Sequence, residues 1–146
     1  MSSPTAPAGL CLEDLAVGQS AELTRIASAA DVEAFAAVTG DDNPVHLDEA
    51  YAASTRFGGR IAHGMLGAGY ISAVVGTRLP GPGAVYISQS LAFRRPVRIG
   101  DAVTASAEVV AIDPVKARVS LRTLCTVDGK TVIEGEAVVM VPRRAS

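Results

Sequence analysis

The residue types best suited to chemistry gather in one short stretch, Gly40-Asp41-Asp42-Asn43-Pro44-Val45-His46. Asp41 contributes a carboxylate and His46 an imidazole, and the Asn43-Pro44 pair between them favours a turn. A carboxylate and an imidazole that reach the same water can act together as general acid and base. Turns of this composition are also common without a catalytic role, so the spacing alone also fits a turn aspartate and a surface histidine.

Residues that follow in the chain could complete such a site. Gly64 begins a predicted long helix, whose first turn offers free main-chain N–H groups and a positive dipole end to developing negative charge. Ser72 lies two turns into that helix without the G-x-S-x-G turn that exposes a nucleophile, so a hydrogen-bonding or structural role is expected. His63 fits a buried structural histidine. A metal site would need His63, Asp41 and His46 to meet, which the sequence does not show, and no metal is expected.

The surrounding pattern predicts the helices that position these residues. Ser28 is placed to cap a first helix, which Gly40 ends directly before the stretch described above. A second short helix is predicted at 48–53. Residues 64–79 are apolar on nearly all faces, which predicts a helix buried on every side. Glycine weakens a helix, so the four glycines of this segment predict close approach by other backbone or by a ligand.

The rest of the chain is patterned for strands. Strands are predicted at 21–26, 84–93, 102–111, 115–127 and 131–141. Apolar and polar residues alternate most clearly from Val115 to Val127, so one face of that strand is expected to be buried. Asp128-Gly129 then predicts a tight hairpin. The chain is therefore expected to form an α+β fold in which a curved antiparallel sheet wraps one long helix.

Composition limits the class of protein. The 146 residues are 49% apolar and 19% charged, which predicts one globular domain at 10–146 behind a flexible tail at 1–9. A net charge of -2 and few aromatic residues favour no nucleic-acid partner. The most apolar run, at 61–75, is too short for a membrane span, and no signal peptide is expected. Cys11 and Cys125 are far apart and expected to be reduced, which favours the cytoplasm.

Two motifs in combination make the chain similar to a known family. The stretch at 40–46 matches a G-D-x-N-P-x-H signature, and Ile61-Ala-His63-Gly64-Met65-Leu66 matches an I-x-H-G-M-L segment. The similarity continues through 79–83, 89–93 and 96–101. The chain resembles the MaoC-like, (R)-specific enoyl-CoA hydratases. In particular it resembles the compact single-hotdog hydratases that supply (R)-3-hydroxyacyl-CoA for polyhydroxyalkanoate synthesis.

This resemblance implies a hotdog fold and a homodimer with active sites near the subunit interface. It implies that Asp41 and His46 activate one water for syn addition across the C2–C3 double bond of a trans-2-enoyl-CoA. The thioester oxygen would accept a hydrogen bond from the main-chain N–H of Gly64. Asn43 and Ser72 would support the site, Asn43 by fixing the loop and the orientation of His46. Coenzyme A is part of the substrate, and no further cofactor is expected.

The resemblance leaves rival functions open. An acyl-carrier-protein-dependent (3R)-hydroxyacyl dehydratase runs the same chemistry backwards with the same residues. A hotdog thioesterase and a non-catalytic acyl-CoA sensor are further alternatives. The basic cluster of Arg94, Arg95 and Arg98 fits either a solvated rim or a site for a phosphate-bearing ligand. Acyl-chain length and the physiological direction of the reaction are not specified by the sequence.

Overall fold

The computed structural model describes residues 9–145, so the predicted tail at 1–9 lies outside them except for Gly9. Six antiparallel strands form one sheet in the order β1-β4-β5-β6-β2, and β3 also pairs with β6. The strands are β1 (Ser20–Ile26), β2 (Val85–Gln89), β3 (Ala92–Phe93), β4 (Ala102–Asp113), β5 (Arg118–Val127) and β6 (Lys130–Met140). The helices are the 3₁₀ turn η1 (Leu12–Asp14), α1 (Ala29–Thr39), α2 (Pro44–Leu47), α3 (Glu49–Ala53) and α4 (Gly64–Thr77).

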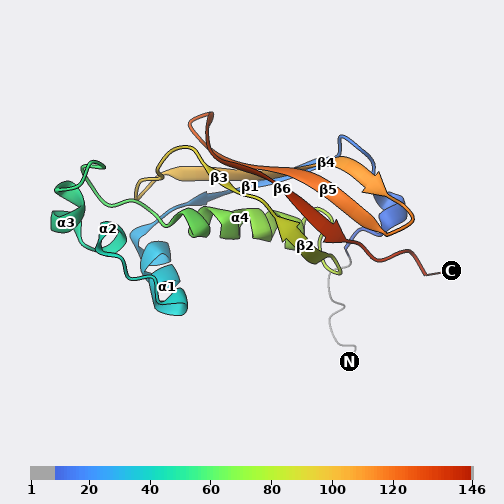
Figure 1. Cartoon of the computed structure of the whole chain (residues 1–146), viewed down its shortest axis with the longest axis horizontal. Coiled ribbons are helices and arrows are strands. Elements are labelled where there is room, and N and C mark those ends of the chain that lie inside the picture. Colours follow the sequence, from blue (N-terminus) through green and yellow to red (C-terminus); the bar gives the residue numbers. More distant parts are fainter. Residues whose placement is uncertain (1–8, 146) are drawn as a thin grey trace, which may run out of the picture.

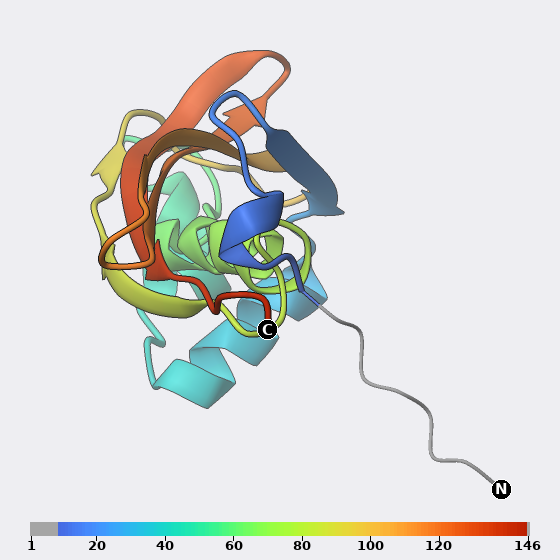
Figure 2. The same cartoon turned by 90° about the vertical axis from the view of Figure 1, so that its right-hand side faces the viewer.

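The sheet curves around α4, as Figure 2 shows with this helix at the centre of the curl. The three shorter helices α1, α2 and α3 gather beyond the N-terminal end of α4, at one end of the long axis in Figure 1. This is the predicted α+β hotdog arrangement. Among the described residues, no helix is long and apolar enough to cross a membrane.

Local signals set most element boundaries. The Ser28 side chain accepts a hydrogen bond from the Asp31 N–H and caps α1, and Gly40 ends that helix in the left-handed conformation with φ 83°. At the hairpin between β5 and β6, Asp128 and Gly129 have φ values of 51° and 76°, the combination that a tight type I′ turn requires. Both predictions are confirmed.

The core lies between α4 and the concave face of the sheet. The alternation predicted for β5 is confirmed in its centre, because Val119, Leu121, Thr123 and Cys125 are all 0% exposed. Its predicted start was wrong. The chain turns between β4 and β5, where Ala117 has φ 55°, and Val115 is 86% exposed.

Two other predictions need correction. The strand predicted at 84–93 is interrupted, because the chain leaves the ladder at Ser90 and Leu91 between β2 and β3. The prediction that α4 is buried on every side is wrong for the single chain, in which Met65 is 54% exposed and Ser72 is also exposed. The physical reason is that one curved sheet covers only one side of a helix.

The glycines of α4 divide between these two sides. A Cβ on Gly67 would lie 2.5 Å from Ile133 Cδ1, and one on Gly64 would lie 2.7 Å from the Phe93 ring. These two positions therefore do allow close approach, but by side chains of the sheet and not by the backbone or ligand that was predicted. Gly69 and Gly76 have nothing within 4 Å of an added Cβ, so packing within the described chain does not explain them.

Candidate active site

His46 lies in the single turn of α2, where the sequence predicted only a loop turn. The Asn43 side-chain oxygen accepts a hydrogen bond from the Val45 N–H at 3.1 Å and so caps this turn. Pro44 follows as the first helical residue, a position where its missing N–H leaves no bond unmade. His46 is the third residue of α2 and only 9% exposed. The cap at Asn43 therefore helps to place the imidazole.

Main-chain groups orient His46 and locate its proton. Its Nδ1 lies 2.7 Å from the carbonyl oxygen of Ile61. Because a carbonyl oxygen can only accept, Nδ1 carries the proton and Nε2 presents a free lone pair. Arg60 Nε donates to the carbonyl oxygen of His46 at 2.7 Å and holds the main chain of the same residue. In its neutral form, the imidazole is therefore arranged to accept a proton at Nε2.

Asp41 follows directly after the glycine that ends α1. Its main-chain N–H donates to Thr39 Oγ1 at 3.2 Å, and its Oδ1 accepts from the Asn43 N–H at 3.4 Å. The latter is a long and weak hydrogen bond. The side chain is exposed and lines the same cavity as His46. Most of the capacity of the carboxylate to accept hydrogen bonds is thus available to a water or a substrate.

His63 contacts both predicted catalytic residues. Its ring stacks on that of His46 with 3.8 Å between centroids, and its Nε2 lies 2.8 Å from the main-chain carbonyl oxygen of Asp41. Nε2 must therefore donate. Its Nδ1 has no hydrogen-bond partner among residues 9–145. The predicted burial of His63 is confirmed at 3% exposure, but this side chain also joins α4 to the loop that holds Asp41.

The same three side chains form a group with metal-ligand composition. One donor atom each from Asp41, His46 and His63 lie within 4.8 Å of one another. The stacked rings fit a shared metal poorly, however, because their planes differ by only 29° at a centroid separation of 3.8 Å. A metal bonded to both rings would lie near both planes, about 2.0–2.1 Å from each nitrogen, and planes so nearly parallel do not meet that close to the rings. The expectation of a metal-free site stays a prediction.

A cavity of about 530 Å³ opens beside this group, and Gly64 lines it together with Asp41 and His46. Gly64 is the first residue of α4, and no side chain caps the helix there. The free N–H groups of the first turn and the positive end of the helix dipole therefore lie at the cavity. Ser72 is exposed and does not line the cavity. The chain thus brings together the predicted carboxylate, imidazole and glycine amide, and leaves Ser72 apart from them.

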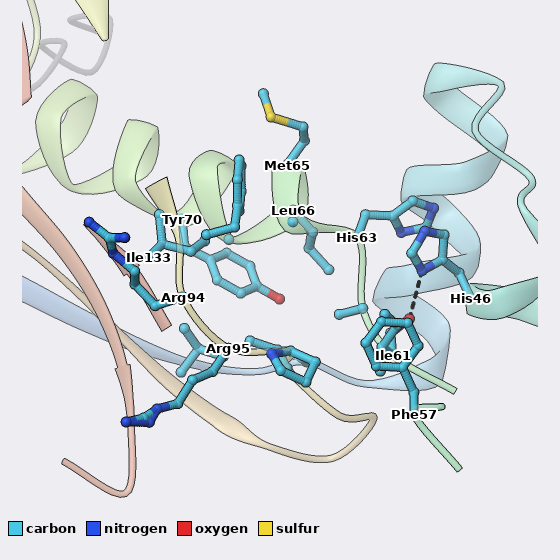
Figure 3. A pocket seen from close by; sticks show the side chains of 18 of the residues that line it. His46, Phe57, Ile61, His63, Met65, Leu66, Tyr70, Arg94, Arg95 and Ile133 are labelled. Carbon is cyan, nitrogen blue, oxygen red and sulfur yellow. Dashed lines mark hydrogen bonds between the residues drawn. The ribbon is translucent and has the colours of Figure 1, made fainter. Parts of the chain in front are cut away.

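Sequence reasoning missed two groups that line the cavity. Tyr70 extends into it from α4, with its hydroxyl towards the interior in Figure 3. Arg56 also lines the cavity, as do Arg94 and Arg95, which the sequence offered either as a solvated rim or as a phosphate site. Helical periodicity could have found Tyr70, because positions 63, 66, 67 and 70 share one helix face. Arg56 belongs to a loop and follows no such period.

One family model matches most of the chain. Residues 14–131 match the family model of the MaoC like domain, which is most of the chain. The chain belongs to the MaoC-like family. The resemblance inferred from the two motifs is thereby confirmed, and the group formed by Asp41, His46 and Gly64 lies within the matched part of this MaoC-like domain.

Relatives of this MaoC-like domain share most of its length. An (R)-specific enoyl-CoA hydratase of Rhodospirillum rubrum is 59% identical over 132 residues, covering 90% of this chain and 92% of the relative. Among solved structures, the unliganded R-hydratase PhaJ1 of Pseudomonas aeruginosa superposes with a TM-score of 0.89 at 48% identity, covering 93% of this chain and 88% of the other. The (R)-hydratase of A. caviae involved in PHA biosynthesis has a TM-score of 0.87 at 46% identity, with coverages of 89% and 99%.

Proposed function

We propose that this protein adds water to trans-2-enoyl-CoA and forms (R)-3-hydroxyacyl-CoA, reversibly. The observation that carries the proposal is the convergence of the Asp41 carboxylate, the free Nε2 of His46 and the N-terminus of α4 at Gly64 on one cavity. Two relatives named as (R)-hydratases or (R)-specific hydratases, similar over nearly their whole length, support the same reaction.

The geometry supports a joint role for Asp41 and His46. Asp41 and His46 hold one water between them, and one of the two takes a proton from it as its oxygen bonds to C3. The electron pair of the C2–C3 double bond moves towards the thioester, whose oxygen becomes enolate-like. The N–H of Gly64 donates to this oxygen. The pair then returns a proton to C2 on the same face, which completes the syn addition. No metal or redox cofactor takes part.

The basic mouth of the cavity supports coenzyme A as the carrier. Arg94 is paired with Glu134 at 2.7 Å, and the Arg56 guanidinium lies 4.9 Å from the Phe57 ring centroid. Arg95 is exposed and forms no ion pair within the described part of the chain. Figure 3 places Arg94 and Arg95 across the cavity from His46. Guanidinium groups bind phosphate well, so this mouth suits the phosphates of coenzyme A.

A matched pair of variants tests the role of this mouth. Arg95→Gln is expected to raise the KM for crotonyl-CoA about 1.5- to fivefold, in the range of an exposed charge pair, and to leave the KM for crotonyl-pantetheine, which lacks phosphate, unchanged. Arg98→Gln is the control, because Arg98 does not line the cavity. An equal change with both substrates, or in both variants, would contradict phosphate binding by Arg95.

The reaction itself is tested with crotonyl-CoA and a longer homologue. Loss of absorbance from the conjugated double bond, followed by chiral analysis that finds the R product, is the expected result. Release of free thiol would instead make the protein a thioesterase. Turnover of the acyl-carrier-protein ester alone would make it the carrier-protein dehydratase, and binding without turnover would make it a sensor.

We propose that a second copy of the chain covers the open side of α4. Met65 on this side is 54% exposed, and Gly69 and Gly76 leave room beside it. The edge strand β2 adds Val85 and Ile87, which are 58% and 42% exposed. Exposed apolar side chains of this kind are typical of a protein–protein interface, where their burial stabilises the complex. Light scattering should give twice the 14.9 kDa of one chain, and a monomer mass would refute the dimer.

The cytoplasm is the compartment proposed for this enzyme. Cys11 and Cys125 are both free thiols, which suits a reducing compartment. Detection of a tagged chain in a periplasmic or secreted fraction would contradict this assignment.

A further inference from the structure

Tyr70 brings an unpartnered polar group into the cavity. Its side chain is on the buried side of α4 and only 8% exposed. Its hydroxyl is buried and has no hydrogen-bond partner among residues 9–145. Figure 3 shows the hydroxyl directed into the space between α4 and the loop that contains Arg95. A buried hydroxyl without a partner is unfavourable, so a water or a ligand group must bond to it in solution.

The surroundings of Tyr70 identify which part of a substrate comes near. The inner wall of the cavity is built from apolar side chains that are almost completely buried, Ala27, Val103 and Ile133. The nucleotide of coenzyme A is charged and must stay at the exposed mouth, where the arginines are. With the thioester at Gly64, the inner space is therefore left to the acyl chain. An alkyl chain suits this wall but offers nothing to a hydroxyl.

We propose that Tyr70 is a specificity-determining residue that limits the acyl chain to short lengths. Its hydroxyl holds a water at the inner end of the cavity. A short acyl chain leaves this water in place, whereas a long chain must displace it and leave the hydroxyl unpaired. The proposal rests on the function proposed above and adds the length of the substrate that the same site accepts.

The chemistry of the hydroxyl fits this role. Burial, and then the nearby negative charge of Asp31, raise the pKa of Tyr70 above its ordinary value of 10.0. The group therefore remains a neutral hydroxyl at physiological pH, able both to donate and to accept. Displacing an ordered water with a group that cannot replace its hydrogen bonds weakens binding.

Three variants separate the hydroxyl from the rest of the side chain. Tyr70→Phe removes only the hydroxyl. Tyr51→Phe makes the same chemical change on α3, outside the cavity, and is the control. Tyr70→Leu replaces the whole phenol ring with a smaller branched alkyl group, so it repeats the test with a different side-chain shape. The measurements are the dissociation constants of butyryl-CoA and octanoyl-CoA, which do not react, and kcat/KM for crotonyl-CoA and trans-2-octenoyl-CoA.

The expected result is a change in the preference between chain lengths. In Tyr70→Phe, octanoyl-CoA should gain about tenfold in affinity relative to butyryl-CoA, which corresponds to about 1.4 kcal/mol. The ratio of kcat/KM values should move in the same direction, Tyr70→Leu should show at least the same shift, and Tyr51→Phe should show none.

Other outcomes overturn the proposal. An unchanged ratio in both Tyr70 variants would mean that the hydroxyl does not act on chain length. An equal loss of affinity for both ligands would place Tyr70 against the pantetheine arm that they share. A wild-type protein that fails to hydrate crotonyl-CoA would refute the proposed function, whereas an unchanged ratio in a protein that does hydrate it would refute the role of Tyr70 alone.

Discussion

Replacement of Asp41 by asparagine should remove the chemistry and leave the scaffold intact. The side chain of Asp41 accepts one long hydrogen bond, from the Asn43 N–H at 3.4 Å, and an amide oxygen can accept the same bond. The contact to His63 Nε2 uses the main-chain carbonyl oxygen of Asp41 and does not depend on the side chain. Because the carboxylate is exposed, no core contact is lost. The free energy of unfolding should therefore change by less than about 0.5 kcal/mol.

The loss of activity should be large by comparison. An amide cannot take a proton from water, and positioned acid–base groups contribute about 10²–10⁴-fold to rate. At about 1.36 kcal/mol for each factor of ten, the barrier should rise by roughly 2.7–5.4 kcal/mol. His46→Gln should lower kcat by at least about 10² for the same reason, since the free Nε2 is lost. The loss should fall on kcat, because neither change removes the arginine groups at the mouth.

The assay is the initial rate of crotonyl-CoA hydration, measured together with the thermal midpoint of each variant. Asp42→Asn is the matched control, because Asp42 is the adjacent carboxylate, is exposed, and does not line the cavity. It should keep the wild-type rate. A rate within tenfold of wild type for Asp41→Asn, or an equal loss for Asp42→Asn, would refute the assignment of acid–base chemistry to Asp41.

Two further predictions concern the scaffold. In Gly135→Ala the new Cβ would lie 1.8 Å from the carbonyl oxygen of Ser90, which belongs to the main chain and cannot rotate away. The free energy of unfolding, measured by urea titration, should therefore fall by about 3 kcal/mol or more. The control Glu136→Ala changes an exposed neighbour and should stay within about 0.5 kcal/mol of wild type. Burial raises the pKa of Cys125 to about 12, so at pH 8 an alkylating reagent should modify Cys11 alone in the native protein and both thiols in urea. Equal stability of the two alanine variants, or two thiols modified in the native state, would contradict these expectations.

The sequence by itself determined the parts of this protein that depend on neighbouring residues. Ser28 begins α1 because its side chain accepts a hydrogen bond from a free N–H of the first turn, and Gly40 ends it because glycine adopts the left-handed conformation easily. Asp128-Gly129 makes its hairpin because both positions tolerate positive φ. The two motifs also identified the family, and they predicted Asp41 and His46 as the catalytic pair. These signals are short, so they can be read without knowledge of the fold.

Only the tertiary structure decided which distant groups meet. The stacking of His63 on His46 and the bond from His46 Nδ1 to the Ile61 carbonyl join segments about fifteen residues apart, and the bond sets which nitrogen of His46 is free. The apolar pattern of α4 predicted burial on every side, yet the curved sheet covers one side and leaves Met65 exposed. Tyr70 likewise reads as an ordinary core residue in the sequence. Its hydroxyl became informative only when packing left it without a partner inside the cavity, because a hydrogen-bonding deficit is a property of the folded surroundings and not of the residue.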